Sequence, residues 1–270
     1  MTKAWTSVFG NLDAHIPKPR TTGITMLLDK YLGPSAVSDY LQLMGDYIDH
    51  WKLTFGTSAL MDEDRLREKI ATVRTHDILV YPGGTLTEVA IARGVCRDYM
   101  RHTLDLGFNG VEISDGTIRL SSAARHDTIQ CALDLGLTVV AEVGKKDPAQ
   151  QQAPEKLAEQ ALVDLESGAA WVIIEARESG RGIGVCADNG AVRGDDVEAM
   201  TSLLGAHGDR VIWEAPLKRQ HEYFILRYGP NVCLGNIAPG DVLAVEAMRV
   251  GLRFETFQRE VDEYEEDTFR

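Results

Sequence analysis

The sequence predicts an α/β fold, a (β/α)8 TIM barrel in a single domain, and three observations support this prediction. Eight short runs of aliphatic and β-branched residues recur along the chain, and each ends in a charged or glycine-rich cluster. Stretches with helical periodicity separate these runs, which is the pattern of parallel strands covered by helices. The length of 270 residues fits one barrel with short extensions.

We expect an N-terminal arm over 1–22, the barrel over 23–257 and an acidic C-terminal tail over 258–270. The expected elements of the barrel, in chain order, are strand 24–29, helix 34–44, strand 48–54, helix 63–74, strand 78–81, helix 87–106, strand 110–114, helix 122–135, strand 138–143, helix 154–166, strand 171–174, helix 197–204, strand 211–213, helix 220–228, strand 232–234 and helix 241–250.

Local signals justify these elements one after another. Pro34 suits the first turn of the first helix, and Pro82 with the two glycines after it ends the third strand. Gly107, Gly136 and Gly168 follow helical stretches, where glycine commonly supplies the left-handed terminating residue. The remaining strands are short apolar runs bounded by turn residues. The longest break, 180–194, carries five glycines and is therefore the best candidate for a lid.

Composition and charge exclude several classes of protein. The net charge is −13 and the sequence has no basic stripe with interleaved aromatics, so we expect no nucleic-acid partner. Neither a bilayer-spanning apolar run nor a signal-peptide core is present, so we expect no membrane partner. The four cysteines are scattered without a CxxC pair, which favours reduced thiols and a cytoplasmic enzyme. Barrels often associate through their outer helices, so we expect a homo-oligomer.

The fourth to seventh expected strands all end in glutamate, at Glu112, Glu142, Glu175 and Glu214. Because side chains alternate along a strand, each carboxylate can point into the mouth of the barrel. Carboxylates that converge there repel one another unless a cation neutralises them. The sequence therefore predicts a Mg²⁺ site, since Mg²⁺ prefers oxygen ligands. The alternative is that each glutamate pairs with a neighbouring lysine or arginine.

Basic residues and glycine turns accompany these carboxylates. Lys52 interrupts an apolar strand, where an unpaired ammonium would be costly, and Lys145 with Lys146 follows Glu142 closely. Glycine turns after several strands bare backbone N–H groups that can bind anions. The turn from Ser179 to Gly184 is not a dinucleotide fingerprint, because a long loop rather than a helix follows it.

Seven segments together resemble the phosphosulfolactate synthase family over about residues 23–257. These segments are Lys52…Phe55-Gly-Thr-Ser58, Tyr81-Pro-Gly-Gly-Thr85, Val111-Glu-Ile-Ser-Asp-Gly116, Glu142-Val-Gly-Lys-Lys146, Glu175…Arg177-Glu-Ser-Gly180, Glu214-Ala-Pro216 and Gly251-Leu-Arg253. The resemblance implies a Mg²⁺-dependent barrel that adds sulfite to phosphoenolpyruvate and yields (2R)-2-phospho-3-sulfolactate. In some archaea this reaction opens coenzyme M biosynthesis.

The resemblance also implies roles for individual residues. We expect Lys145 to donate the proton, with Lys52 as its substitute, and the four strand-end glutamates to hold the metal. The residues expected to bind the substrate anions are Lys30, Tyr81, Gly83, Gly84, Ser114, Arg177, Ser179, Asn236 and Arg253.

The chain departs from the family pattern in places. Tyr31 stands where the family tends to have glycine and would narrow the mouth, and Leu53-Thr54-Phe55 replaces a Phe-Gly-Trp-like run. These departures leave two alternatives open. One is a related Mg²⁺-dependent addition of another nucleophile to an enolic phosphate or unsaturated acid. The other is a non-catalytic barrel resembling the plant heat-stress-associated proteins.

Overall fold

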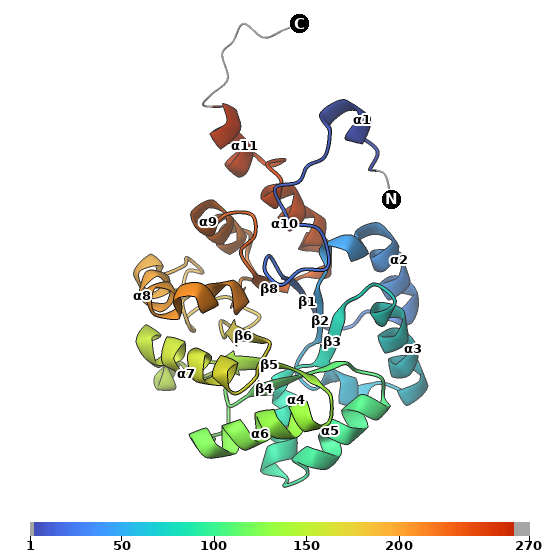
Figure 1. Ribbon diagram of the computed structural model, residues 1–270, viewed down its shortest axis with the longest axis vertical. Helices are drawn as coiled ribbons and strands as arrows, with labels where there is room; N and C mark the ends of the chain where they lie inside the picture. Colours follow the sequence, from blue (N-terminus) through green and yellow to red (C-terminus); the bar gives the residue numbers. More distant parts are fainter. Residues whose placement is uncertain (1–2, 262–270) are drawn as a thin grey trace, which may run out of the picture.

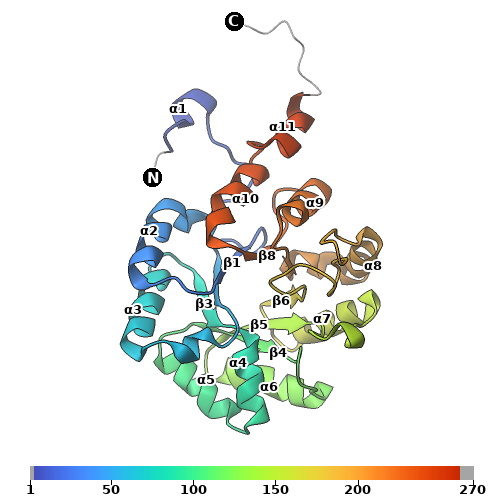
Figure 2. The ribbon, with the colours of Figure 1, turned by 180° about the vertical axis from the view of Figure 1, so that it is seen from behind.

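Eight parallel strands form a nearly closed barrel, as the sequence predicts (Figures 1 and 2). The structure is a computed structural model that describes residues 3–261. The strands pair in the order β3-β2-β1-β8-β7-β6-β5-β4. They are β1 (Thr25–Asp29), β2 (His50–Leu53), β3 (Leu79–Pro82), β4 (Gly110–Ser114), β5 (Thr138–Val143), β6 (Trp171–Ile174), β7 (Val211–Glu214) and β8 (Leu234–Ile237).

Helices surround the barrel and cover the outer face of the strands (Figure 1). The α-helices are α1 (Thr6–Phe9), α2 (Pro34–Met44), α3 (Glu63–Arg74), α4 (Gly84–Ala92), α5 (Cys96–Asp105), α6 (Ser122–Asp134), α7 (Pro154–Glu166), α8 (Gly194–Leu204), α9 (Lys218–Tyr228), α10 (Val242–Arg249) and α11 (Phe254–Val261). Short 3₁₀ turns are η1 (Gly45–Tyr47), η2 (Thr57–Leu60), η3 (Pro148–Gln150), η4 (Gly205–Arg210) and η5 (Pro239–Asp241).

Alternation along the strands divides the apolar residues into two cores. Side chains such as Trp51, Val111 and Val172 belong to the outer core between the strands and the helices. Met26 and Ile173 belong to a smaller core that fills the inside of the barrel. Inward-facing positions further along the strands carry charge instead, so the inner core forms the floor of a polar mouth.

The barrel has one seam, between β3 and β4, where no strand pairing joins the neighbours. The side chain of Asn109 bridges it: its Oδ1 accepts from Val80 N at 2.8 Å and its Nδ2 donates to Ile78 O at 3.3 Å. The backbone carbonyl of Asn109 meanwhile accepts from Thr138 N at 3.0 Å. The side chain of Asn109 therefore replaces part of the missing ladder, and its side chain and backbone together connect three strands.

A bulge in β8 changes the direction of one side chain at the mouth. Two residues of β1, Thr25 and Leu27, stand opposite Leu234 and Ile237, so β8 holds one more residue over this stretch. Asn236 lies in the bulge with φ 58°. Bulges of this kind bend a strand and redirect a side chain. Gly235 and Asn236, which follow the strand expected over 232–234, therefore belong to the strand itself.

Two segments lie outside the helical ring. The N-terminal arm is fastened by His15, whose Nδ1 is 2.7 Å from Glu246 Oε2 and whose Nε2 is 2.8 Å from Gly23 O. Helices α1 and α11 lie at the same end of the molecule, beyond α10 (Figures 1 and 2). The predicted acidic tail begins inside α11, and residues 262–270 of it lie outside the described residues.

The structure corrects three element predictions. The single helix expected over 87–106 is two helices, because Gly94 adopts φ 70° and ends α4. The strand expected over 232–234 begins at Leu234 and runs to Ile237. Helix α11 was not expected, because the sequence after Gly251 shows only a short apolar pattern.

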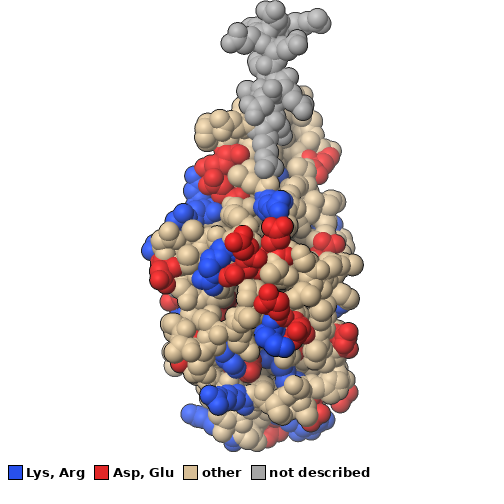
Figure 3. Space-filling model, turned by 90° about the vertical axis from the view of Figure 1, so that its left-hand side faces the viewer, with Lys and Arg blue, Asp and Glu red and all other residues tan. Residues whose placement is uncertain are grey.

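Two further observations concern possible membrane-spanning helices and surface charge. Within residues 3–261 we find no helix with the length and hydropathy needed to cross a bilayer. On the face drawn in Figure 3, lysine and arginine side chains are interspersed with aspartate and glutamate rather than gathered into a positive stripe.

The seam gives a stability prediction. Replacing Asn109 with alanine removes the hydrogen bonds to Val80 N and Ile78 O and leaves the buried backbone N–H of Val80 without this partner. We expect Asn109→Ala to lower the free energy of unfolding by about 1–3 kcal/mol, measured by urea denaturation. The matched control is Asn11→Ala in the exposed arm. We expect this substitution to change the free energy of unfolding by less than about 0.5 kcal/mol. Equal effects of the two substitutions would contradict a special role of Asn109 at the seam.

Candidate active site

A polar cavity of about 210 Å³ opens at the C-terminal ends of the strands. In a (β/α)8 barrel this face carries the catalytic groups. The residues that line it are Leu28, Lys52, Thr54, Phe55, Gly83, Gly84, Thr85, Glu112, Glu142, Lys146, Glu175, Arg177, Glu178, Glu214 and Asn236. The four strand-end glutamates predicted from the sequence therefore do converge.

Lys52 stands among three of these carboxylates. Its Nζ lies 2.7 Å from Glu112 Oε2, 3.0 Å from Glu142 Oε2 and 3.4 Å from Glu214 Oε1. Each of these glutamates is at most 2% exposed, and Lys52 is 5% exposed. The ammonium thus neutralises part of a charge that burial would otherwise make very unfavourable.

Lys146 holds the other side of the cluster. Its Nζ lies 3.0 Å from Glu142 Oε1, 3.3 Å from Glu88 Oε1 and 3.6 Å from Glu175 Oε2. Glu142 therefore forms ion pairs with both lysines, one at each oxygen. Lys146 is also more accessible than Lys52, with a quarter of its side chain exposed.

Glu88 is a member of the cluster that the sequence reasoning missed. It is 2% exposed on α4, and its Oε2 accepts from Thr117 N at 2.9 Å and Ile118 N at 3.1 Å. Ser114 Oγ donates to Glu88 Oε1 or to Glu142 Oε1, each at 2.9 Å. Glu88 thus fixes the loop after β4. Its position inside a helix, away from any strand end, gave no signal in the sequence.

The charges perturb one another strongly. Burial raises the pKa of Glu112 to about 8, although Lys52 opposes the rise. Burial, together with the neighbouring Glu142 and Glu214, raises the pKa of Glu175 well above its ordinary value. Burial would do the same to Glu142, but Lys146 and Lys52 outweigh it and hold its pKa well below that value. Perturbed carboxyl groups in a cavity are typical of functional sites.

Several polar atoms in the cavity wall have no hydrogen-bond partner. Glu175 Oε2 and Asn236 Oδ1 are buried without one, and Glu112 Oε2 touches Lys52 without a directed hydrogen bond. Within residues 3–261 no three His, Cys, Asp or Glu side chains are already arranged around a metal position. The reason is that the two lysines stand between the carboxylates. The free oxygens nevertheless suit a hard cation, which would take over part of the neutralisation.

Two glycines in the cavity wall are required by close packing. A Cβ on Gly84 would lie 2.7 Å from both Glu112 Oε1 and Ser114 Cβ, and Gly84 N donates to Glu112 Oε1 at 2.6 Å. A Cβ on Gly83 would lie 2.8 Å from Phe55 N. Gly84 therefore allows α4 to approach β4 across the seam and fixes the orientation of Glu112, whereas Gly83 allows the chain to approach the loop after β2.

Lys145, expected as the proton donor, lies outside the cavity lining. Its Nζ lies 2.7 Å from Asp115 Oδ2 and 3.1 Å from Ile118 O. Gly144, with φ 124°, stands between β5 and the two lysines, and Lys146 rather than Lys145 lines the cavity. Lys145 instead fastens the β4–α6 loop.

Tyr81 also lies elsewhere than expected. It is fully buried in the barrel floor, where its hydroxyl donates to Met26 Sδ at 2.9 Å. It is one inward position below the mouth, because Gly83 rather than Tyr81 reaches the level of the carboxylates. Ser114 is likewise fully buried and orients carboxylates instead of lining the cavity.

Of the other residues expected to bind anions, some line the cavity and some lie outside it. Arg177 and Asn236 line the cavity, whereas Lys30, Ser179 and Arg253 do not. Lys30 forms an ion pair with Glu178 at the mouth, and Arg253 lies near Glu255. Tyr31 is 77% exposed and outside the lining, so it does not narrow this cavity. These distinctions depend on loop conformations, which the sequence motifs do not specify.

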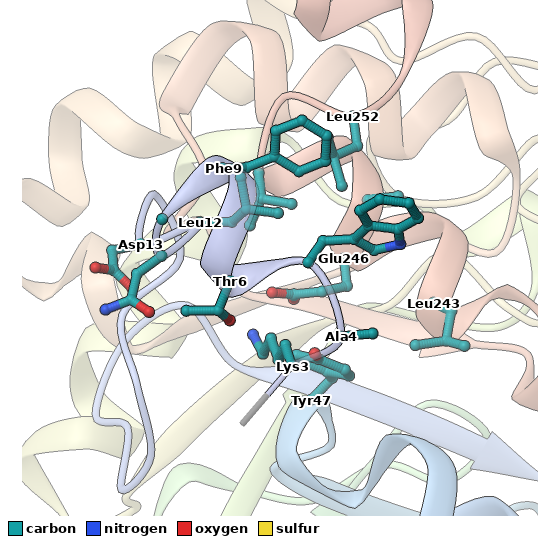
Figure 4. A pocket seen from close by; sticks show the side chains of 15 residues that line it. Lys3, Ala4, Thr6, Phe9, Leu12, Asp13, Tyr47, Leu243, Glu246 and Leu252 are labelled. Carbon is teal, nitrogen blue, oxygen red and sulfur yellow. The ribbon is translucent and has the colours of Figure 1, made fainter. Parts of the chain in front are cut away.

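A larger cavity of about 580 Å³ lies between the N-terminal arm and α10 (Figure 4). Apolar side chains such as Phe9, Leu12 and Leu252 line much of it. Its buried carboxylate, Glu246, is already paired with His15. It contains none of the strand-end glutamates, so the barrel mouth is the stronger candidate for catalysis.

Comparisons with known proteins agree with the resemblance seen in the motifs. The sequence pattern of the (2R)-phospho-3-sulfolactate synthase (ComA) family matches residues 13–255. The phosphosulfolactate synthase of Methanothermobacter thermautotrophicus is 42% identical over 241 residues, which cover 88% of this chain and 93% of that protein. The corresponding protein of Methanocaldococcus jannaschii is 43% identical over 237 residues, with 87% and 94% covered.

Two more distant similarities are also informative. Protein HEAT-STRESS-ASSOCIATED 32 of Arabidopsis thaliana is 23% identical over 259 residues, covering 86% of this chain and 87% of that protein. The crystal structure of an HpcH/HpaI aldolase from Desulfitobacterium hafniense DCB-2 superposes with a TM-score of 0.54, at 11% identity and with 91% and 95% covered. The latter similarity concerns the fold alone.

The packing of Gly84 gives a prediction with a matched control. Gly84→Ala places a methyl group against Glu112 Oε1 and Ser114 Cβ, so the carboxylate or α4 has to move. We expect the free energy of unfolding to fall by about 1–3 kcal/mol. Gly33 has no atom near the position of its Cβ, and Gly33→Ala should change it by less than about 0.5 kcal/mol. Urea denaturation of both variants checks this, and an unaffected Gly84→Ala variant would contradict the close packing.

Proposed function

This chain belongs to the (2R)-phospho-3-sulfolactate synthase family, and we propose that it adds sulfite to the methylene carbon of phosphoenolpyruvate in a Mg²⁺-dependent reaction. The product is (2R)-2-phospho-3-sulfolactate. The similarity of this chain to known synthases supports an enzyme of this class. The substrates, the metal and the carbon–sulfur chemistry are what we propose.

One observation carries this proposal more than any other. Two lysine ammonium groups alternate with strand-end carboxylates around a single cavity, with Glu142 in contact with both lysines. Such an arrangement offers proton donors and cation ligands within a few ångströms of each other, as an addition to an unsaturated acid requires. A protein with a purely protective role would not need these groups to be buried together, which disfavours the heat-stress alternative.

We propose that Glu112, Glu142 and Glu175 hold the Mg²⁺, with Glu214 supporting them. Glu112 Oε2 and Glu175 Oε2 support this choice, because each is buried near a lysine ammonium but has no hydrogen bond, and a hard cation would supply a further partner. When bound, the ion supplies Lewis-acid stabilisation of negative charge on the substrate carboxylate. Five carboxyl groups against two lysines leave room for an additional positive charge in this cluster.

The chain's own residues prepare the two anions for reaction. Arg177 lines the cavity, and it forms no ion pair within the described part of the chain, so its guanidinium is free to bind the phosphate. Gly84 and Thr85, in the first turn of α4, also border the cavity, where a helix N-terminus favours negative charge. The sulfur lone pair forms the new bond to the methylene carbon. The π electrons of the double bond then move toward the neighbouring carbon and its carboxylate.

Protonation of that neighbouring carbon completes the addition, and the geometry favours Lys146 as the donor over Lys145. Lys146 lines the cavity and is partly exposed, whereas Lys145 is bound to the Asp115 loop. Lys52 is more tightly enclosed among carboxylates, which suits a role in holding them apart. In the structure the carboxylates around Lys146 raise its pKa, and a cation bound among them would reduce this effect.

The proposal extends to the cellular location, the oligomeric state and the metabolic pathway of the protein. We propose a cytoplasmic homo-oligomer whose product enters a sulfolactate route or, as in some archaea, coenzyme M biosynthesis. The scattered free cysteines support a reducing compartment.

The reaction itself is tested by phosphorus NMR. Incubation of the protein with phosphoenolpyruvate, sulfite and Mg²⁺ should convert the enol-phosphate resonance into that of a new organophosphate. Sulfite labelled with sulfur-34 should appear in the product by mass spectrometry, and EDTA should stop the conversion. If the phosphoenolpyruvate resonance persists at full intensity with active controls, the proposed substrates are wrong.

The choice of proton donor is tested by two neighbouring lysines. Lys146→Met should reduce kcat by about 10²–10⁴-fold, because general acid catalysis contributes rate enhancements of that size. Lys145→Met should retain kcat within about tenfold, since this side chain fastens a loop outside the cavity. Melting temperatures measured in parallel would reveal any variant that loses activity through unfolding. The opposite ranking of the two variants would restore Lys145 as the donor.

A further inference from the structure

Left-handed backbone conformations gather at the cavity. Four non-glycine residues have positive φ in the described chain: Phe55 (55°), Asp77 (52°), Arg177 (61°) and Asn236 (58°). Phe55, Arg177 and Asn236 line the cavity, and only Asp77 lies away from it. This conformation is unfavourable for residues with a β-carbon, above all for a bulky aromatic such as phenylalanine. Residues in such conformations cluster at active sites and ligand-binding sites.

The backbone of Phe55 is held in place from both sides. Its neighbour Thr54 donates from N to Asp29 O at 3.1 Å and accepts from Thr57 Oγ1 at 2.8 Å. On the other side the backbone of Phe55 packs against Gly83, so closely that a Cβ there would lie 2.8 Å from Phe55 N. The loop therefore requires the left-handed turn. Glycine would adopt this turn without strain. The presence of phenylalanine at this position therefore indicates a use for its ring.

The ring of Phe55 has little structural use. The residue is 43% exposed and belongs to neither hydrophobic core. It borders a cavity whose other lining residues are mostly polar or charged, with Leu28 as the other large apolar side chain. Leu28 stands opposite Lys52 in the pairing of β1 with β2, and Phe55 follows the end of β2. The cavity thus has an apolar side at the ends of β1 and β2.

We propose that Phe55 is a substrate-contacting residue whose ring covers the methylene carbon of the enolic substrate and keeps water away from it. This inference rests on the proposed function, because the methylene group is the one apolar part of phosphoenolpyruvate. The carboxylate and the phosphate face the charged side of the cavity, and the apolar edge faces Phe55 and Leu28. Exclusion of water there also strengthens the interactions of the charged groups with the developing negative charge.

The test compares Phe55→Gly, Phe55→Ala and Phe55→Trp with Asp77→Gly. Asp77 shares the left-handed conformation but is exposed in the turn before β3, so Asp77→Gly relieves strain without touching the cavity. Melting temperatures of the ligand-free proteins and kcat/KM for phosphoenolpyruvate, at saturating sulfite and Mg²⁺, are measured for all variants.

We expect Phe55→Gly and Asp77→Gly both to melt higher than the wild type, by on the order of 2 °C. Phe55→Ala keeps the strain and should not melt higher. Both Phe55→Gly and Phe55→Ala should lose about tenfold or more in kcat/KM, whereas Asp77→Gly should be unchanged. Phe55→Trp should recover most of the activity, because it restores an aromatic wall.

Two results would overturn the inference while leaving the proposed function intact. In the first, the wild type is active and Phe55→Gly has the same kcat/KM as the wild type. In the second, Phe55→Ala has the kcat/KM of the wild type although it lacks the ring. If the wild type turns over no phosphoenolpyruvate, the proposed function fails first. In that case the melting temperatures of the wild type and of Phe55→Gly are measured with and without phosphoenolpyruvate and Mg²⁺. A rise in the wild type that is absent in Phe55→Gly supports the contact between ring and ligand. No rise in the wild type overturns the inference.

Discussion

Burial of several carboxylates in one layer of the barrel is the constraint on which the rest of the site depends. Glu112, Glu142, Glu175 and Glu214 are almost inaccessible at the ends of neighbouring strands. Such charges are tolerated in a protein interior only when they are paired or protonated. Lys52 and Lys146 supply the pairing, and burial supplies the raised pKa values of Glu112 and Glu175. The molecule thus buries a cluster of carboxylates whose charge is only partly balanced by its two lysines.

The same cluster helps to close the barrel. The seam between β3 and β4 lacks strand pairing, and the hydrogen bonds that cross it include those of Asn109 near the floor and of Gly84 near the mouth. Because Gly84 N donates to Glu112, a carboxylate of the site is also a structural link between α4 and β4. Thr87 Oγ1 adds a further bond, to the carbonyl of Glu112 at 2.7 Å. The fold and the site therefore share residues at the seam, and a substitution at one of these residues alters both the packing of α4 on β4 and the orientation of Glu112.

The wall of the cavity shows a second compromise between stability and function. Phe55, Arg177 and Asn236 hold left-handed conformations that glycine would adopt more easily. The bulge in β8 fixes Asn236, and the tight approach of Gly83 to the loop after β2 fixes Phe55. Proteins keep such conformations when the surrounding structure determines them and the side chain is useful. Three of the four left-handed non-glycine residues in the described chain therefore lie in the wall of this one cavity.

The sequence by itself determined the barrel, most strand and helix positions, and the convergence of the four glutamates. Strand periodicity is a local property, and in a parallel barrel the strand ends meet at one face whatever the loops do. Only the tertiary structure decided which lysine enters the cavity, since Gly144 interrupts the alternation before Lys145 and Lys146. It also placed Tyr81 in the floor, paired Lys30 with Glu178, and brought Glu88 in from a helix. Beyond the strand ends, loop dihedral angles and long-range packing determine side-chain direction, and neither follows from residue spacing.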